Sequence, residues 1–393
     1  MQPSVKCFTL ELANIADPDP LIDGIVRMPN LTYLELISHR NDLDGLADAI
    51  MELRSLRVIS LPVYYLTWRM LEILADLSHL EEFKCSSPLP ASFDPSKPVS
   101  QCFLPSNLPF RRSAFPVLKK LTLATAIAPL LNHLVQQSFL RRLSTLHLIL
   151  TQPEPPSQIQ ILLTALSQYM VTLKDFSLED LDYLVSKIKG RTGASYANCR
   201  ISFNNLEPIL ALRNLTSLRF RFKFPLAESW TNHEVEVLSV TLPNIETLAL
   251  NENPYVVLPE SHPTLTLDIL RHFARNCLKL QHLGIYVSGR MGITTETGAF
   301  RALRTLDVGR SSVQDKAHIA VFLAQVLMPM CKIIHARKSS NEVEGYDAVV
   351  TMIEPLRHMS VVKENFIRAS MEQRIDKLQA ELEKLRMITG LGA

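Results

Sequence analysis

The sequence lacks the features of a secreted, metal-binding or membrane-spanning protein. Its six cysteines are scattered over 393 residues, none of them in a C-x-x-C pair and none with a histidine at zinc-ligand spacing. The first residues contain no apolar signal core, and no apolar run reaches about 18 residues. These absences predict reduced cysteines that behave as small hydrophobic side chains, no membrane span, and a cytoplasmic or nuclear location.

Motifs of common enzymes are also missing. The sequence has no G-x-S-x-G, no H-E-x-x-H, no phosphate-binding Walker loop and no G-x-G-x-x-G. The eleven histidines are dispersed. Acidic neighbours such as Glu81 and Glu82 point in different directions on a strand and make poor acid–base pairs. We therefore expect no enzyme, no cofactor and no metal. A catalytic site distributed along the chain stays the minor alternative.

The overall charge is nearly balanced. The formal net charge is +2, with 47% apolar and 20% charged residues. This is the composition of a globular protein. A net charge this small gives no reason to expect a nucleic-acid partner or a membrane surface.

The most informative feature is a repeated motif of the form L-x-x-L-x-L. Clear copies begin at Leu31, Leu56, Leu118, Leu143, Leu215, Ile245 and Leu303, and weaker ones at Val5, Leu80, Leu173 and Leu280. A possible last strand starts at Cys331. The tightest steps are about 25 residues long, within the leucine-rich-repeat range of about 20–29 residues.

Between the motifs the apolar period changes from that of a strand to that of a helix. Apolar residues at helical spacing occupy 43–53, 70–77, 159–170, 269–274 and 319–327. One strand and one amphipathic helix cannot bury their apolar faces alone, so neighbouring repeats must stack. The predicted fold is an α/β leucine-rich-repeat solenoid, with parallel strands on the concave face, helices outside and a C-terminal helix.

This interpretation divides the chain into three parts. Residues 1–336 form the irregular solenoid, with a proline-rich insertion at about 86–116 that we expect to be a surface loop. Residues 337–360 form a linker and a helical cap. Residues 361–393 form a charged amphipathic helix and tail.

The C-terminal part contains a short heptad-like seam. Its apolar residues are Met371, Ile375, Leu378, Leu382 and Leu385. The 4-3-4-3 spacing is that of a coiled coil, although only two to three heptads are present. Two interpretations are open: a helix that docks on the last repeat or projects from it, or a helix through which two chains associate.

The x positions of the repeats are the best candidates for a binding site, because they project away from the core. The candidate partner-binding residues are Tyr33, Glu35, Arg57, Lys84, Lys120, His147, Arg219, Arg221, Glu246, His282, Arg304 and Asp307. Tyrosine and arginine are frequent protein-binding hot spots. The alternation of Arg219, Phe220 and Arg221 also fits a solvated strand face better than a nucleic-acid site.

The chain resembles the repeat region of fungal F-box/leucine-rich-repeat proteins in three features: its irregular repeats, the segment from Leu242 to Leu250, and its proline-rich insertions. The resemblance covers residues from about 5 to 335. It implies a protein that selects substrates for a ubiquitin ligase and binds a Skp-type adaptor. The sequence shows no F-box-like opening with the pattern L-P-x-E-x-L. Recruitment of the adaptor is therefore an expectation of the family alone.

Two functions follow from these observations. The first is a non-enzymatic protein–protein interaction module, expected to be the substrate-recognition part of an F-box-type ubiquitin ligase that lacks a visible F-box. The alternative is a structural or self-assembling scaffold that uses the C-terminal helix.

Overall fold

Twelve parallel strands in the described part of the chain form one continuous sheet. The computed structural model describes residues 5–11, 19–38, 45–86, 110–111, 113–151, 154–180, 200–227, 229–254, 265–289, 298–336, 346–357, 371, 373–375 and 377–381. The strands are β1 (Cys7–Glu11), β2 (Tyr33–Ile37), β3 (Val58–Pro62), β4 (Glu82–Ser86), β5 (Lys120–Thr125), β6 (Thr145–Leu150), β7 (Asp175–Asp180), β8 (Ser217–Arg221), β9 (Thr247–Leu250), β10 (His282–Ile285), β11 (Thr305–Gly309) and β12 (Lys332–His335). They follow one another in the sheet in sequence order.

Helices connect the strands on one side of this sheet. The α-helices are α1 (Asp19–Val26), α2 (Leu46–Met51), α3 (Trp68–Asp76), α4 (Ile127–Gln136), α5 (Pro156–Tyr169), α7 (Phe203–Leu206), α8 (Asn232–Thr241), α9 (Ile269–Asn276) and α10 (Lys316–Val326). Short 3-10 helices are η1 (Val63–Tyr65), η3 (Leu140–Arg142) and η5 (Glu207–Ala211). A further helix covers 346–357.

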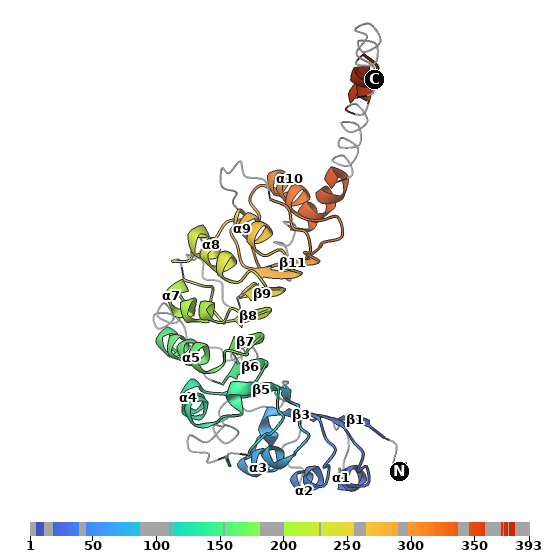
Figure 1. Cartoon of the computed structure of the whole chain (residues 1–393), viewed down its shortest axis with the longest axis vertical. Helices are drawn as coiled ribbons and strands as arrows, with labels where there is room; N and C mark the ends of the chain where they lie inside the picture. Colours follow the sequence, from blue (N-terminus) through green and yellow to red (C-terminus); the bar gives the residue numbers. More distant parts are fainter. Residues whose placement is uncertain are drawn as a thin grey trace, which may run out of the picture.

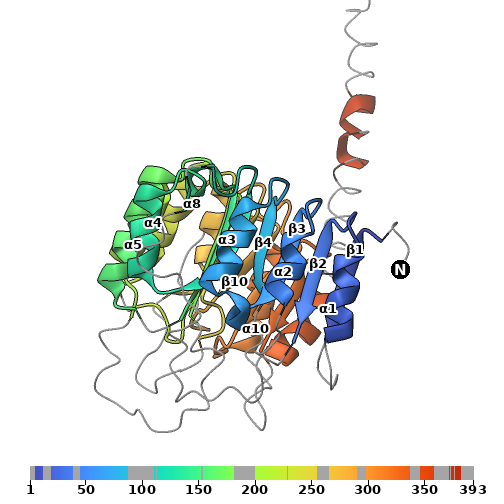
Figure 2. The same ribbon diagram turned by 90° about the horizontal axis from the view of Figure 1, so that it is seen from below.

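The array is curved. Figure 1 shows the strands along the inner side of an arc and the helices along its outer side. In Figure 2 the helices α1, α2 and α3 lie side by side along the amino-terminal repeats. This arrangement is the predicted leucine-rich-repeat solenoid, with a parallel sheet on the concave face.

The core is a ladder of apolar side chains that runs through every repeat. The register aligns Leu34, Ile59, Phe83, Leu121, Leu146, Phe176, Leu218, Leu248, Leu283 and Leu306, with the ladder completed by Ile333 on β12. The aligned residues from Leu34 to Leu306 are all buried. Each strand therefore stacks its apolar side chain on that of the next strand, as expected for a repeat whose faces cannot be buried alone.

The predicted strand positions are confirmed, but each strand begins about two residues after its motif. The first leucine of the motif is buried in the turn that precedes the strand. In the second repeat, the backbone N–H of Leu31 donates to the carbonyl of Met28 at 3.0 Å, and β2 starts at Tyr33. The first motif position thus anchors the turn to the core, while the strand face begins later.

The end of the proline-rich insertion, expected within a surface loop at 86–116, combines exposed residues with two that are buried. Residues 87–109 lie outside the described residues. Ala114 and Phe115 are buried, and the Phe110 ring lies 5.9 Å from Trp68 and 5.8 Å from Phe139. Aromatic contacts at these distances are stabilising. The end of the insertion therefore packs between the helical sides of the repeats that contain α3 and α4.

The helix at 346–357 packs on the last repeat, through buried Tyr346, Val349 and Ile353. Beyond it, short helical segments are described at 373–375 and 377–381. Leu382 and Leu385 of the predicted seam lie outside the described residues. Within the described part of the chain, no helix has the length and apolar character needed to cross a bilayer.

A charge placed in the apolar ladder tests this core. We expect Leu248→Asp to lower the free energy of unfolding by at least about 3 kcal/mol, because a buried carboxylate has no partner there. Thermal denaturation followed by circular dichroism measures the effect. The control is Thr247→Asp, on the opposite face of β9. Equal melting temperatures for Leu248→Asp and wild type would refute the inward placement of the leucine.

Candidate functional site

Two rows of side chains line the concave face of the sheet, because alternate strand residues point away from the helices. The first row contains Tyr33, Val58, Glu82, Lys120, Thr145, Asp175, Ser217, Thr247, His282, Thr305 and Lys332. The second row includes Glu35, Ser60 and Lys84, and then Thr122, His147, Ser177, Arg219, Ala249, Gly284 and Asp307. Together the rows form a mainly polar surface along the array.

The structure places nine of the twelve candidate residues on strands: Tyr33, Glu35, Lys84, Lys120, His147, Arg219, Arg221, His282 and Asp307. Three others, Arg57, Glu246 and Arg304, come directly before β3, β9 and β11. These three lie on the amino-terminal rim of the sheet and not in the rows, because the strands begin later than the motif. Their exposed side chains still border the concave face.

Two carboxylates organise the polar side chains around β3, β4 and β5. Glu81 on the rim lies 3.3 Å from Arg57 and 3.2 Å from Lys119. Glu82, on the first row, lies 2.9 Å from Lys84 and 3.4 Å from Lys120. Burial opposes ionisation of Glu82, but the two lysines outweigh it and lower the pKa of its carboxyl. We call these six residues the basic patch, because four cations surround two carboxylates.

A second polar group lies on β6, β7 and β8. His147 Nε2 is 3.3 Å from an oxygen of Asp175, and Ser217 neighbours Asp175 in the register. Burial alone would raise the pKa of Asp175, but the interactions with His147 and Ser217 outweigh it and lower the pKa. Asp175 therefore stays ionised on the face beside the His147 ring.

A third group contains a buried carboxylate, Glu252, near the carboxyl ends of β8 and β9. Asn251 precedes it with a φ of 55° and accepts a hydrogen bond from the backbone N–H of Phe222 at 2.9 Å. This turn directs the Glu252 side chain over Gly284. A Cβ atom added to Gly284 would lie only 3.1 Å from the Glu252 carboxylate. Glu252 is only 4% exposed and lies 3.6 Å from Arg221. Gly284 thus makes room for an acidic side chain against the sheet.

Asp307, on the neighbouring strand β11, adds a second acid to this group. One of its oxygens accepts a hydrogen bond from the backbone N–H of Gly309 at 2.8 Å. Burial raises the pKa of Asp307, even though that bond and nearby cations lower it. Burial likewise raises the pKa of Glu252, and the charge of Asp307 adds to the increase. We call Arg221, Glu252 and Asp307, with Glu179 at 3.6 Å from Arg221, the acidic group.

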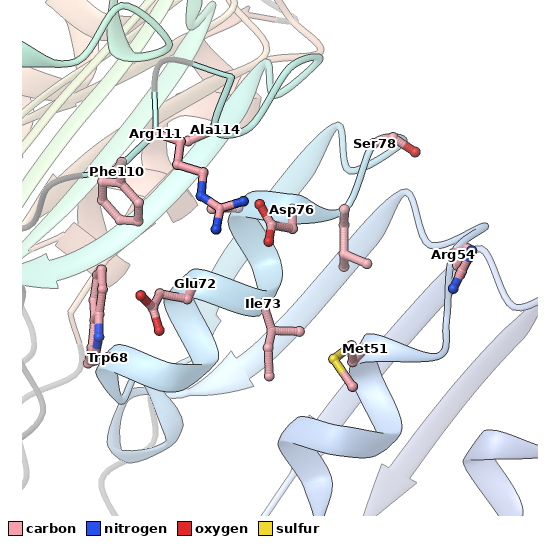
Figure 3. Close-up of a pocket in the computed structure, with 12 residues that line it drawn as sticks. Met51, Arg54, Trp68, Glu72, Ile73, Asp76, Ser78, Phe110, Arg111 and Ala114 are labelled. Carbon is pink, nitrogen blue, oxygen red and sulfur yellow. The ribbon is translucent and has the colours of Figure 1, made fainter.

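A pocket of about 500 Å³ lies on the other side of the molecule, beside α3 and the end of the insertion. Figure 3 shows Trp68 and Phe110 on one side, with Arg111 and Asp76 next to each other. None of the twelve candidate residues lines it. The repeat pattern did not predict this pocket, because Phe110 belongs to an insertion and not to a repeat.

The described residues show no metal centre, and most of their cysteines are buried. No group of three or more histidine, cysteine, aspartate or glutamate side chains there could hold a metal ion. Burial raises the pKa of Cys277 to about 12 and of Cys331 to about 11, so both are thiols near neutral pH. Cys102 and Cys199 lie outside the described residues.

Comparisons with known proteins add little to this description. No protein-family model matches the chain, and no curated protein matches its sequence. One similar solved structure, a TLR13–ssRNA13 complex, has 14% identity and a TM-score of 0.38 over 88% of this chain and 55% of that chain. Another, an LRIM1/APL1C complex, has 10% identity and a TM-score of 0.26 over 98% and 78% of the two chains.

The chain therefore spans about half the length, 55%, of the first of these structures. Neither likeness identifies a family or a ligand. The assignment of the fold rests on the parallel strands, their register and the apolar ladder of this chain itself.

The buried carboxyl of Glu252 predicts a pH-dependent stability. Its pKa in the folded chain is raised above 4.5, so the folded state binds this proton more tightly than the unfolded state. The contribution of Glu252 to stability is therefore greatest below about pH 4.5 and is lost as the pH rises through the raised pKa. We expect Glu252→Gln, which resembles the protonated acid, to melt above wild type at pH 7 and closer to it at pH 4.5.

The control is Glu246→Gln, an exposed rim residue on the same repeat. Melting temperatures of the three proteins from pH 4.5 to 7 measure the effect. A Glu252→Gln variant less stable than wild type at pH 7 would show that the ion pair with Arg221 outweighs the burial of the carboxylate.

Proposed function

We propose that this protein is a non-enzymatic interaction module whose concave face binds a protein partner. The observation that carries the proposal is the continuous strand face, on which charged side chains of neighbouring repeats form ion pairs while the helices bury the other face. Ordered charges of both signs favour one partner and one orientation over others.

The size of the face supports this function. Twelve strands spaced about 4.8 Å apart give a surface about 50 Å long. A standard protein interface buries about 800 Å² on each partner. The strand face can therefore hold a complete protein interface, whereas the pocket beside α3, at about 500 Å³, has the size of a small-molecule site. Tyr33, Arg219 and Arg221 have the side chains most often found at the centre of such interfaces.

The resemblance to fungal F-box/leucine-rich-repeat proteins implies a finer role. In that role the partner is a substrate for ubiquitination, and a Skp-type adaptor binds elsewhere on the chain. The described residues contain no feature that argues for adaptor binding, so this role is a prediction from the resemblance. The capture experiment below tests it together with the interaction itself.

A second candidate function, self-association, is favoured by one observation at the C-terminal end. Met371, Ile375 and Leu378 are 61%, 50% and 56% exposed, respectively, and follow one another at heptad spacing. Apolar side chains in this pattern are typical of a helix that pairs with another helix. We propose that two chains pair through this seam if the protein acts as a scaffold.

Capture of the partner tests the interaction. The full chain with Tyr33→Ala, Arg219→Ala and Arg221→Ala should recover at least about tenfold less partner than wild type from an extract of its own cells, because hot-spot truncations cost about 2 kcal/mol or more each. The control carries Tyr169→Ala, Arg69→Ala and Arg275→Ala on the helical side. Equal recovery by both variants would contradict binding on the concave face.

Mass spectrometry of the captured proteins tests the finer role. A Skp-type adaptor and a cullin among them would place the chain in a ubiquitin ligase. If specific partners are captured with neither an adaptor nor a cullin, the chain is an interaction module and the ubiquitin-ligase role is excluded.

Self-association is tested by the mass in solution. If the seam pairs two chains, light scattering will give twice the chain mass of 44.4 kDa for the full chain and the single-chain mass for Ile375→Gln with Leu378→Gln. The control is Arg374→Gln with Lys377→Gln, which leaves the apolar seam unchanged. A single-chain mass for the wild-type protein up to about 100 μM would end this alternative.

A further inference from the structure

The basic patch carries an excess of positive charge in one small area. Its four cations, Arg57, Lys84, Lys119 and Lys120, surround only Glu81 and Glu82. With these groups ionised, four positive and two negative side chains give the patch a net charge of +2. The whole chain has the same formal charge, +2. The excess is therefore a local feature of β3, β4 and β5 and does not reflect a generally basic protein.

The carboxylates hold the cations in place without neutralising them. Glu81 contacts one cation on each flanking repeat, whereas Glu82 contacts Lys84 on its own strand and Lys120 on the next, at distances of 2.9–3.4 Å. The side chains of the four cations are 44–63% exposed. Their charged groups therefore remain accessible to an anion, while the shared carboxylates oppose their rotation away from the face. Such an arrangement reduces the entropy that a binding anion must remove from long side chains.

We propose that the basic patch binds an acidic segment of the protein partner, one with several aspartate or glutamate side chains. This inference rests on the proposed interaction function and names the chemistry of the partner. The three strands span about 10 Å at their usual spacing, and an extended peptide advances about 3.3 Å per residue. About three to four consecutive residues of the partner therefore cross the patch.

The composition of the patch favours a peptide over a nucleic acid. Glu81 and Glu82 lie within the patch, where they would repel a continuous phosphate backbone. The patch residues include no aromatic side chain on which a base could stack, whereas single-stranded nucleic acids are usually held by such stacking. Carboxylates placed between the cations instead suit a ligand whose charges are carried on separate side chains.

The test is fluorescence polarisation with labelled hexaglutamate as the probe and the full chain as receptor. Hexaglutamine and a twelve-nucleotide oligo-dT are the comparison probes. We expect hexaglutamate to bind in about 0.05 M salt and to bind at least about tenfold more weakly in about 0.5 M salt, because salt screens exposed charges. Hexaglutamine should not bind.

Two sets of variants locate the binding. Lys84→Gln with Lys119→Gln and Lys120→Gln should weaken hexaglutamate binding about tenfold or more. The matched control, Arg304→Gln with Lys316→Gln and Lys332→Gln, removes the same charge from the last repeats and should have little effect. Glu81→Gln should tighten binding about two- to fivefold, because the loss of a repelling negative charge outweighs the looser placement of Arg57 and Lys119. A misfolded variant cannot produce this gain.

The outcomes separate this inference from the interaction function. Equal weakening by the two triple variants, or no tightening by Glu81→Gln, overturns the patch as the site. If oligo-dT binds more tightly than hexaglutamate, and the patch variant loses this binding, the ligand of the patch is a nucleic acid and not an acidic peptide. If hexaglutamate fails to bind while the cellular partner is still captured through Arg219 and Arg221, the interaction function stands and the acidic segment is excluded.

Discussion

The stacking of one apolar side chain per strand on that of the next strand is the interaction on which the rest of this structure depends. The ladder from Leu34 through Phe176 to Leu306 is buried throughout. No single repeat can shield such a face, so each strand is stable only against its neighbours. The parallel register follows from this requirement, and the register in turn fixes which polar side chains become neighbours on the concave face.

The insertion after β4 shows how the array tolerates an irregular repeat. Only two register pairs, Glu82 with Lys120 and Phe83 with Leu121, are formed between β4 and β5. On the helical side, Phe110 and Phe115 lie between Trp68 and Phe139. The apolar core therefore continues across the irregular repeat, partly through aromatic residues of the insertion. The same packing forms one wall of the pocket beside α3.

Charge on the concave face changes along the array. Cations exceed carboxylates at β3–β5, whereas carboxylates exceed the single guanidinium of Arg221 in the acidic group. The two regions differ in burial as well. The basic patch is open to solvent, whereas Glu252 is buried over Gly284. One face can thus present two different electrostatic environments to a single partner, which favours one orientation of binding.

The sequence by itself determined the fold class, the order of the strands and most of the outward-facing residues. A repeated L-x-x-L-x-L pattern has few other ways to bury its leucines. Only the tertiary structure decided the rest. Arg57, Glu246 and Arg304 lie on the rim of the sheet, because each strand begins about two residues after the first residue of its motif. The tertiary structure also brought Glu252 over Gly284 and Lys119 next to Glu81, since such contacts join different repeats and depend on the register between them.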